Sequence, residues 1–310
     1  MANLFYNFSP KFQQTLKKAE ALRHQILLTP LAPKQEIKLR WEAGLNRIYY
    51  TLQLTGNPSS KIAITKLLTN PPRHRLKITQ QEAINYKKAF DYISQNWLVS
   101  NRNVAFSTIL TLHKIYPRPH FHPIQIHKAL KQLLTYLQTT QPENPFVQAG
   151  IAFIRFPHFD QNQHLAHLFA YLLLYKQGFD CRGLLVLEEY FAADLLTFQR
   201  VASSAQKTNN LTFWLEYFAQ AVASQLETTA SKLLSPISFQ YPSASFWKLN
   251  ERQKVILTFL DQPNTIITNR QVQKMFKVSQ ITASRDLTKL KNLNLVFSHG
   301  RGRSTTYSKV

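Results

Sequence analysis

The 310-residue chain has one cysteine, seven glycines, few acidic residues and no long apolar segment. The lone Cys181 excludes an intramolecular disulfide framework and a cysteine-based zinc site. No apolar run approaches the roughly 20 residues that cross a bilayer. The N-terminus also lacks a basic segment followed by an apolar one. We therefore expect a soluble cytoplasmic protein that makes no membrane contact.

Scarce glycine and few strand patterns predict a mainly α fold. The hydrophobic content of 44%, with 12% aromatic residues, indicates a folded chain that is long enough for two or three domains. Only 16 Asp and Glu oppose 38 Lys and Arg, so the formal net charge is +22. Such an excess points to a polyanionic partner such as nucleic acid. The alternative is a general basic composition without a specific partner.

Apolar residues recur at helical spacing over long parts of the chain. The first predicted helix spans 8–28, with Ser9 as its N-cap and Pro10 in its first turn. A second spans 34–54, and Thr79 with Glu82 forms a capping-box pattern further along. The other predicted helices of this part of the chain span 61–68, 79–93, 104–114, 124–139, 145–154 and 165–175.

The segment 155–174 joins a polar loop, broken by Pro157, to a leucine-rich helix whose expected N-cap is Asp160 or Asn162. A loop that enters a helix N-terminus is a natural anion site. These residues resemble the core motif of the Fic (Fido-fold) family, His-Pro-Phe-x-Asp/Glu-Gly-Asn-Gly-Arg-x-x-Arg. Pro157, Asp160 and Asn162 match the motif's proline, acidic residue and central asparagine.

The positions that carry the family's chemistry differ in this chain. Phe156 stands where the family has its catalytic histidine, Gln161 and Gln163 replace two glycines, and His164 and His167 replace two arginines. Phenylalanine cannot accept a proton, and glutamine side chains would enter the backbone nest that holds phosphates. Histidine lacks the bidentate, always-charged grip of arginine. The resemblance thus implies a Fic-like fold that has lost nucleotide transfer.

Other readings of this segment remain open. Asp160 matches the carboxylate that holds magnesium in the family, and it is equally an ordinary helix cap. His158 could substitute for the missing base. His158, Asp160, His164 and His167 together could bind a metal such as zinc. No cofactor is expected, but ATP and Mg²⁺ would be the cofactors if nucleotide binding persists.

Residues 51–58 resemble the inhibitory motif of Fic proteins, Ser/Thr-x-x-x-Glu-Gly/Asn, with Thr51, Thr55 and Gly56 as its remnant. Thr55 replaces the glutamate, and the resemblance pairs it with His167. Without the resemblance, Gly56 is a helix C-cap. The segment 115–123 contains three prolines and leaves little room for the family's flap hairpin.

We predict an N-terminal helical region over 1–97, a degenerate Fic core over 98–234, a Ser- and Pro-rich linker over 235–247 and a further domain over 248–310. This last domain should contain three helices followed by strands at 295–298 and 305–308. It resembles the winged helix-turn-helix that many Fic proteins carry at this place. It holds twelve Lys and Arg against three acidic residues.

DNA is the expected partner of the C-terminal domain, through its recognition helix and its wing. The predicted contact residues are Ser279, Gln280, Thr282, Ser284, Arg285, Lys289, Arg301 and Arg303. The alternative is a domain that docks a protein partner or forms a homodimer.

The chain is therefore predicted to be a mainly α, Fic-like pseudoenzyme that acts as a DNA-binding or regulatory adaptor. One alternative is an atypical protein adenylyltransferase that uses ATP and magnesium at Asp160. Another is a scaffold that binds a nucleotide without transferring it.

Overall fold

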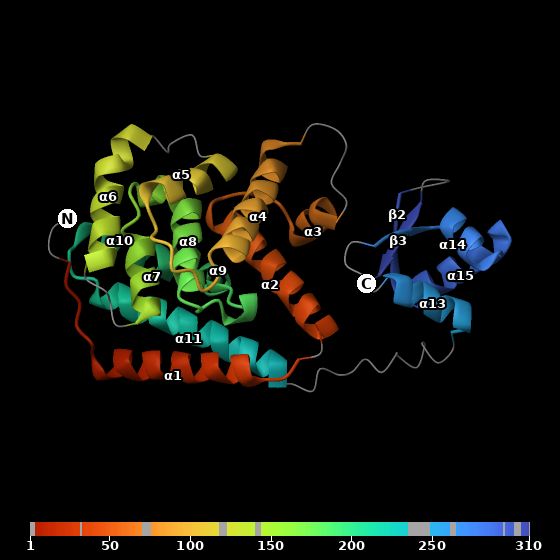
Figure 1. The fold of residues 1–310 in the computed structure, drawn as a ribbon, viewed down its shortest axis with the longest axis horizontal. Helices are drawn as coiled ribbons and strands as arrows, with labels where there is room; N and C mark the ends of the chain where they lie inside the picture. Colours follow the sequence, from red (N-terminus) through yellow and green to blue (C-terminus); the bar gives the residue numbers. More distant parts are fainter. Residues whose placement is uncertain are drawn as a thin grey trace. The chain divides into compact units, whose positions relative to one another are not determined.

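The computed structural model describes residues 4–31, 33–69, 76–117, 123–139, 144–234, 249–260, 265–293, 295–300 and 305–309. Contacts divide the chain into two compact units, Met1–Ser235 and Pro236–Val310 (Figure 1). The predicted regions 1–97 and 98–234 both lie in the first unit. The predicted linker over 235–247 lies outside the described residues.

The first unit is built from helices in its described parts. They are α1 (Pro10–Leu28), α2 (Pro33–Leu54), α3 (Lys61–Thr69), α4 (Ile78–Asn96), α5 (Phe106–Ile115), α6 (Pro123–Thr139), α7 (Pro145–Ile154), α8 (Phe159–Lys176), the 3-10 turn η1 (Cys181–Gly183), α9 (Leu187–Ala193), α10 (Leu195–Lys207) and α11 (Thr212–Leu234).

Local sequence signals explain several helix starts. Ser9 caps α1 by accepting a hydrogen bond from the Phe12 backbone N–H at 3.1 Å. The predicted capping box at Thr79 is wrong, because Lys77 is the N-cap of α4 and its backbone N–H donates to Gln80 Oε1. Glu82 accepts instead from Asn57 Nδ2 at 2.7 Å, which ties the end of α2 to α4.

Long helices pack side by side around one apolar core. Figure 1 shows α1 lying along α11, and α7 packs against α8. Gly150 of α7 allows a close approach to α11: a Cβ atom there would lie 3.0 Å from Leu215 Cδ2 and 3.1 Å from Phe218 Cδ1. Trp214 Nε1 donates to the Gly150 carbonyl at 2.8 Å. This contact holds α7 against α11. The four residues after α7, 155–158, form the loop of the motif-like segment and are called the motif loop below.

The second unit has the predicted order of three helices followed by two strands, with one further short strand. Its elements are α13 (Glu251–Leu260), β1 (Ile267–Thr268), α14 (Asn269–Phe276), α15 (Gln280–Asn292), β2 (Val296–His299) and β3 (Thr306–Lys309). The antiparallel sheet has the order β1-β3-β2, with Ile267 opposite Tyr307 and Ser298 opposite the same Tyr307.

A separate apolar core holds this unit together. Ile256 of α13, Val272 of α14 and Leu287 of α15 are fully buried in it. A unit of this size needs such a core because its surface-to-volume ratio is high. The core occupies one face of α15 and leaves the opposite face exposed.

Within the described ranges, no helix combines the length and apolarity that crossing a membrane requires.

Candidate functional sites

The motif loop makes a sharp turn between α7 and α8. His158 has a left-handed backbone (φ 51°) and occupies the N-cap position of α8, so the expected cap Asp160 is wrong, whereas Asn162 marks a break at which the leucine-rich part of α8 begins. Asn162 interrupts the helical geometry (φ −123°, ψ 24°), and its Nδ2 donates to the carbonyls of Pro157 and His158. Asn162 is buried, and its side chain therefore ties the last two residues of the loop to α8.

Phe156, which the resemblance aligns with the family's catalytic histidine, is part of the core. Its side chain is 2% exposed, and its ring contacts Phe169 of α8 edge-on at 6.1 Å between centroids. The hydrophobic effect accounts for this placement without any chemical role.

His164, at the first arginine position, is buried and joined to the end of α2. Its Nε2 and Thr55 Oγ1 share a hydrogen bond of 2.8 Å, and its ring lies 4.9 Å from that of Tyr116. The predicted pairing of Thr55 with His167 is therefore wrong, because Thr55 contacts the residue one turn earlier on α8. Gly56 follows with φ 80° as the αL residue that ends α2.

His167, at the second arginine position, faces a buried carboxylate. Its Nδ1 lies 3.3 Å from Glu188 Oε1 of α9, and its ring meets the Phe153 ring edge-on at 4.5 Å. Both His167 and Glu188 are almost fully buried. Burial raises the pKa of Glu188, but the hydrogen bond from His167 and the charges of His167 and Arg47 outweigh it and lower that pKa below 4.5.

Glu188 is the centre of a buried polar cluster that sequence reasoning missed. Tyr171 donates to its Oε2 at 2.8 Å, while Tyr86 and Thr51 donate to its Oε1 at 3.3 and 3.4 Å. The buried Arg47 guanidinium donates to the carbonyls of Gly183 and Leu185 and lies over the ring of Phe90. The cluster joins α2, α4, α8 and α9. The available signal was a Glu188-Glu189 pair that directly follows the apolar run 184–187.

The two remaining polar residues of the motif point elsewhere. His158 and Asp160 are exposed beside a hollow of about 310 Å³, and Gln206 Nε2 reaches Asp160 Oδ1 at 3.4 Å. Neither His164 nor His167 lines this hollow. Across the part of the chain that the structure describes, no group of three or more His, Cys, Asp or Glu side chains could hold a metal ion.

The residues at this loop do not fit ATP with magnesium. A phosphate needs donors, but Asn162 Oδ1 and Gln163 Oε1 are buried acceptors without a partner among the described residues. The amide orientation of Asn162 follows from its two donated bonds. The histidines at the arginine positions are directed at Thr55 and Glu188. No step through a nucleotide follows from this geometry.

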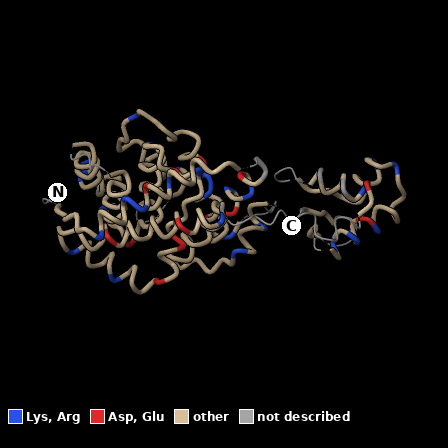
Figure 2. The backbone as a smooth tube through the Cα atoms, turned by 90° about the horizontal axis from the view of Figure 1, so that it is seen from below, with Lys and Arg blue, Asp and Glu red and all other residues tan. Residues whose placement is uncertain are grey.

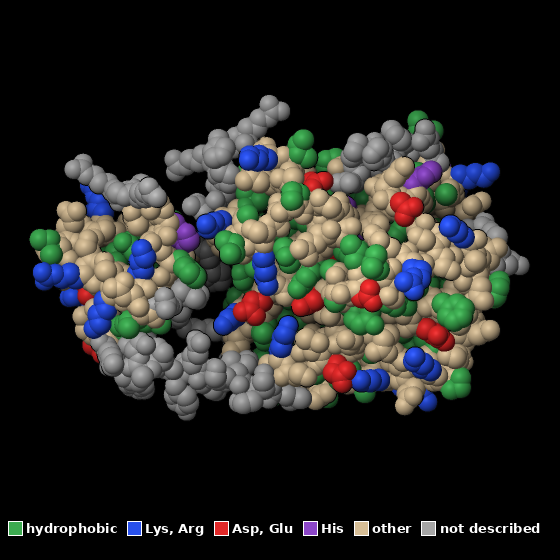
Figure 3. Space-filling model, turned by 180° about the vertical axis from the view of Figure 1, so that it is seen from behind, with side chains coloured by type: hydrophobic (Ala, Val, Ile, Leu, Met, Phe, Trp, Pro, Cys, Tyr) green, Lys and Arg blue, Asp and Glu red, His purple; other side chains and the backbone are tan. Residues whose placement is uncertain are grey.

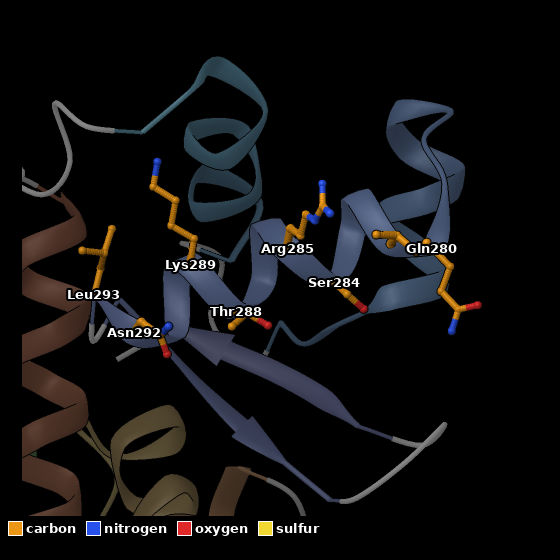
Figure 4. Close-up of a pocket in the computed structure, with 8 residues that line it drawn as sticks. Gln280, Ser284, Arg285, Thr288, Lys289, Asn292 and Leu293 are labelled. Atoms are coloured by element: carbon orange, nitrogen blue, oxygen red, sulfur yellow. The ribbon is translucent and has the colours of Figure 1, made fainter.

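The second unit presents the other candidate site, on the exposed face of α15. Figure 4 shows the side chains that line an open groove of about 690 Å³ along this helix. They are Gln280, Ile281, Ser284, Arg285, Thr288, Lys289, Asn292 and Leu293. The spacing of four residues places Ser284, Thr288 and Asn292 in one row and Arg285 and Lys289 in another.

The predicted DNA contacts divide into exposed residues and residues with local roles. Gln280, Ser284, Arg285 and Lys289 line the groove, whereas Ser279 is the N-cap of α15 and accepts from the Thr282 backbone N–H. Ser284 Oγ also accepts from Asn269 Nδ2 of α14 at 2.9 Å. Arg301 and Arg303 lie outside the described residues. The groove residues not predicted are Ile281, Thr288, Asn292 and Leu293, which helical spacing from Ser284 and Lys289 would have identified.

Charge on α15 is one-sided because its single acid is buried. Asp286 is 3% exposed and accepts hydrogen bonds from Arg252 and Gln253 of α13. Burial raises the pKa of Asp286, and these hydrogen bonds together with the Arg252 charge lower it below its usual value. Arg285 and Lys289 are exposed on the opposite side. By contrast, on the face of the first unit in Figure 3, basic side chains stand among acidic and apolar ones; Figure 2 marks charged residues along both units.

No protein-family description and no curated protein matches this chain. Several solved structures match it. A Fic family protein from Desulfovibrio desulfuricans G20 aligns with 98% of this chain and 97% of its own, at 13% identity and a TM-score of 0.62. Fic-1 from C. elegans (residues 134–508) aligns with 73% of this chain and 72% of its own, at 17% identity and a TM-score of 0.57.

A Fic domain containing signaling protein from Bacteroides thetaiotaomicron aligns with 72% of this chain and 96% of its own, at 16% identity and a TM-score of 0.53. The overall arrangement of α-helices is thus shared despite low sequence identity. This chain has the mainly α fold of Fic family proteins.

Proposed function

We propose that this protein is a DNA-binding regulator whose Fic-fold unit does not transfer nucleotides. The observation that carries the proposal is the exposed face of α15, where polar and basic side chains line an open groove and the only acid of the helix is buried. Such a mixture can bond to base edges and to phosphates.

The element order of the second unit supports this role. α14 and α15 are joined by Lys277 in a left-handed conformation (φ 51°), and the Asn269 side chain bridges to α15. This pair has the features of a helix-turn-helix, in which the second helix enters the major groove. With β2 and β3 following, we assign the unit as a winged helix.

The motif loop supports the second half of the proposal. Transfer of a nucleotide to a hydroxyl needs a base within reach of that proton. Phe156 has no such group and is buried, and the exposed His158 points from a different backbone position. The buried histidines at the arginine positions support the fold through Thr55 and Glu188.

DNA binding is tested with the full chain and a fluorescent duplex in low salt. The double substitution Arg285→Ala and Lys289→Ala should weaken binding about tenfold or more, because it removes two cations from the exposed face of α15. The control, Lys11→Ala with Lys17→Ala, removes the same charge from exposed positions of α1. Equal weakening by both pairs would show that binding depends only on net charge and would contradict a site on α15.

Nucleotide transfer is tested with labelled ATP, magnesium and either the chain alone or cell lysate. We expect no transfer of label. Robust labelling that Asp160→Ala abolishes would overturn the non-catalytic assignment and support an adenylyltransferase.

A further inference from the structure

Ile281 is an aliphatic residue that lies outside the core of the second unit. It is 65% exposed, in the first turn of α15, among the polar and basic residues that line the groove. Within the described residues it is not among the apolar side chains that pack against the core of the second unit. The buried positions of the helix, Ala283, Leu287 and Leu290, fall on the other side.

The surroundings of Ile281 are held in place. Asn269 Nδ2 donates to the Gln280 carbonyl at 3.3 Å and to Ser284 Oγ at 2.9 Å, so α14 holds the backbone before Ile281 and a side chain one turn after Gln280. Isoleucine is β-branched and stiff about χ1, and it therefore loses little rotamer freedom when it meets a surface. A stiff aliphatic group on a fixed helix start suits contact with a defined apolar feature.

The major groove offers such a feature. Each base pair there presents hydrogen-bonding groups, and thymine adds an apolar C5-methyl group. The first residues of a recognition helix are the ones that meet base edges. Gln280 precedes Ile281 and can pair with adenine, while Arg285, one turn later, can pair with guanine.

We infer that Ile281 reads a thymine methyl group, so that α15 selects an A·T pair at its N-terminal end. This inference rests on the proposed function and names the sequence class that the same face recognises. Gln280 and Arg285 then supply the hydrogen-bonded part of the readout.

The test begins with the full chain and a random duplex library, from which the most enriched duplex is taken as the probe. Each thymine of that probe is replaced in turn by deoxyuridine, which removes only the methyl group. One replacement should weaken binding about fourfold, the factor expected for one buried methyl group. With Ile281→Ala, the thymine and deoxyuridine probes should bind equally.

Ile266→Ala serves as the control, because Ile266 is an exposed isoleucine of the same unit that does not line the groove. It should retain the full methyl effect. Binding that is insensitive to every methyl group, or a methyl effect that survives in Ile281→Ala, overturns the inference and leaves DNA binding intact. Failure to enrich or bind any duplex overturns the proposed function itself.

Discussion

Three positions of the segment that resembles the Fic motif hold side chains that pack in the core or bond to buried partners. Phe156 contributes to the core, and His164 and His167 bond to Thr55 and Glu188. The resemblance directed Thr55 to a histidine of this segment but to His167 instead of His164, and it gave no sign of Glu188. Thr55 lies more than a hundred residues from His164 in the chain, and Glu188 matched no motif, so only the packing of α2, α8 and α9 brings them together.

Restoring the base alone should not restore chemistry. Phe156→His introduces a polar ring at a 2% exposed site, where the core offers it apolar neighbours. We expect a loss of about 2 kcal/mol of unfolding free energy, from lost apolar burial and an unsatisfied polar group. Chemical denaturation measures the loss, and labelled ATP should give no product. Label transfer by this variant would show that the phosphate site is intact.

Glu188 predicts a pH dependence of stability. Its folded-state pKa is lowered below 4.5, so the ionised form contributes stability above that value and loses this contribution as the pH falls through the folded-state pKa. Glu188→Gln should be about 3 kcal/mol less stable near neutral pH, because the nearby buried Arg47 charge loses its opposite. The Glu188→Gln variant should also lose less unfolding free energy than the wild type between pH 6 and pH 3.

Urea unfolding across this pH range measures both effects. Glu189→Gln is the matched control: Glu189 is half-buried and accepts one long hydrogen bond from Tyr50 at 3.4 Å. Parallel pH profiles for wild type and Glu188→Gln would contradict the assigned role of Glu188.

At the scale of helices and strands, prediction succeeded where local signals decide the structure. Ser9 and Pro10 mark the start of α1 as predicted, and in the structure Thr268 caps α14 with its side chain. α10 was missed, and so was β1, a strand of two residues that exists only by pairing with β3. Elements that depend on distant partners leave little trace in local sequence.

Two glycines within helices offer a matched pair. A Cβ atom at Gly44 of α2 meets nothing within 4 Å, whereas one at Gly150 of α7 would crowd Leu215 and Phe218. Gly44→Ala should stabilise the protein by up to about 1 kcal/mol through helix propensity. Gly150→Ala should destabilise it by about 1 to 2 kcal/mol, because overpacking against α11 exceeds that gain. Thermal unfolding of both variants measures the difference, and equal shifts would contradict the close packing of α7 on α11.

At the scale of the whole molecule, we propose a Fic fold that does not bind ATP. A ligand that binds the native state raises the unfolding temperature. ATP, with or without magnesium, should therefore leave the melting temperature of the full chain unchanged. A rise of several degrees that requires magnesium would show a working nucleotide site and favour a nucleotide-binding scaffold.

The central claim, DNA binding through the second unit, is tested most directly by the affinity of the full chain for duplex DNA across a salt series. Each phosphate neutralised contributes a slope of about −0.9 to the plot of log K against log salt concentration. If α15 and the basic residues around it contact about four phosphates, the slope should be near −3.6. Substitution of Arg285 and Lys289 by alanine should reduce the magnitude of the slope. An affinity that does not change with salt, or no binding in low salt, would contradict the claim.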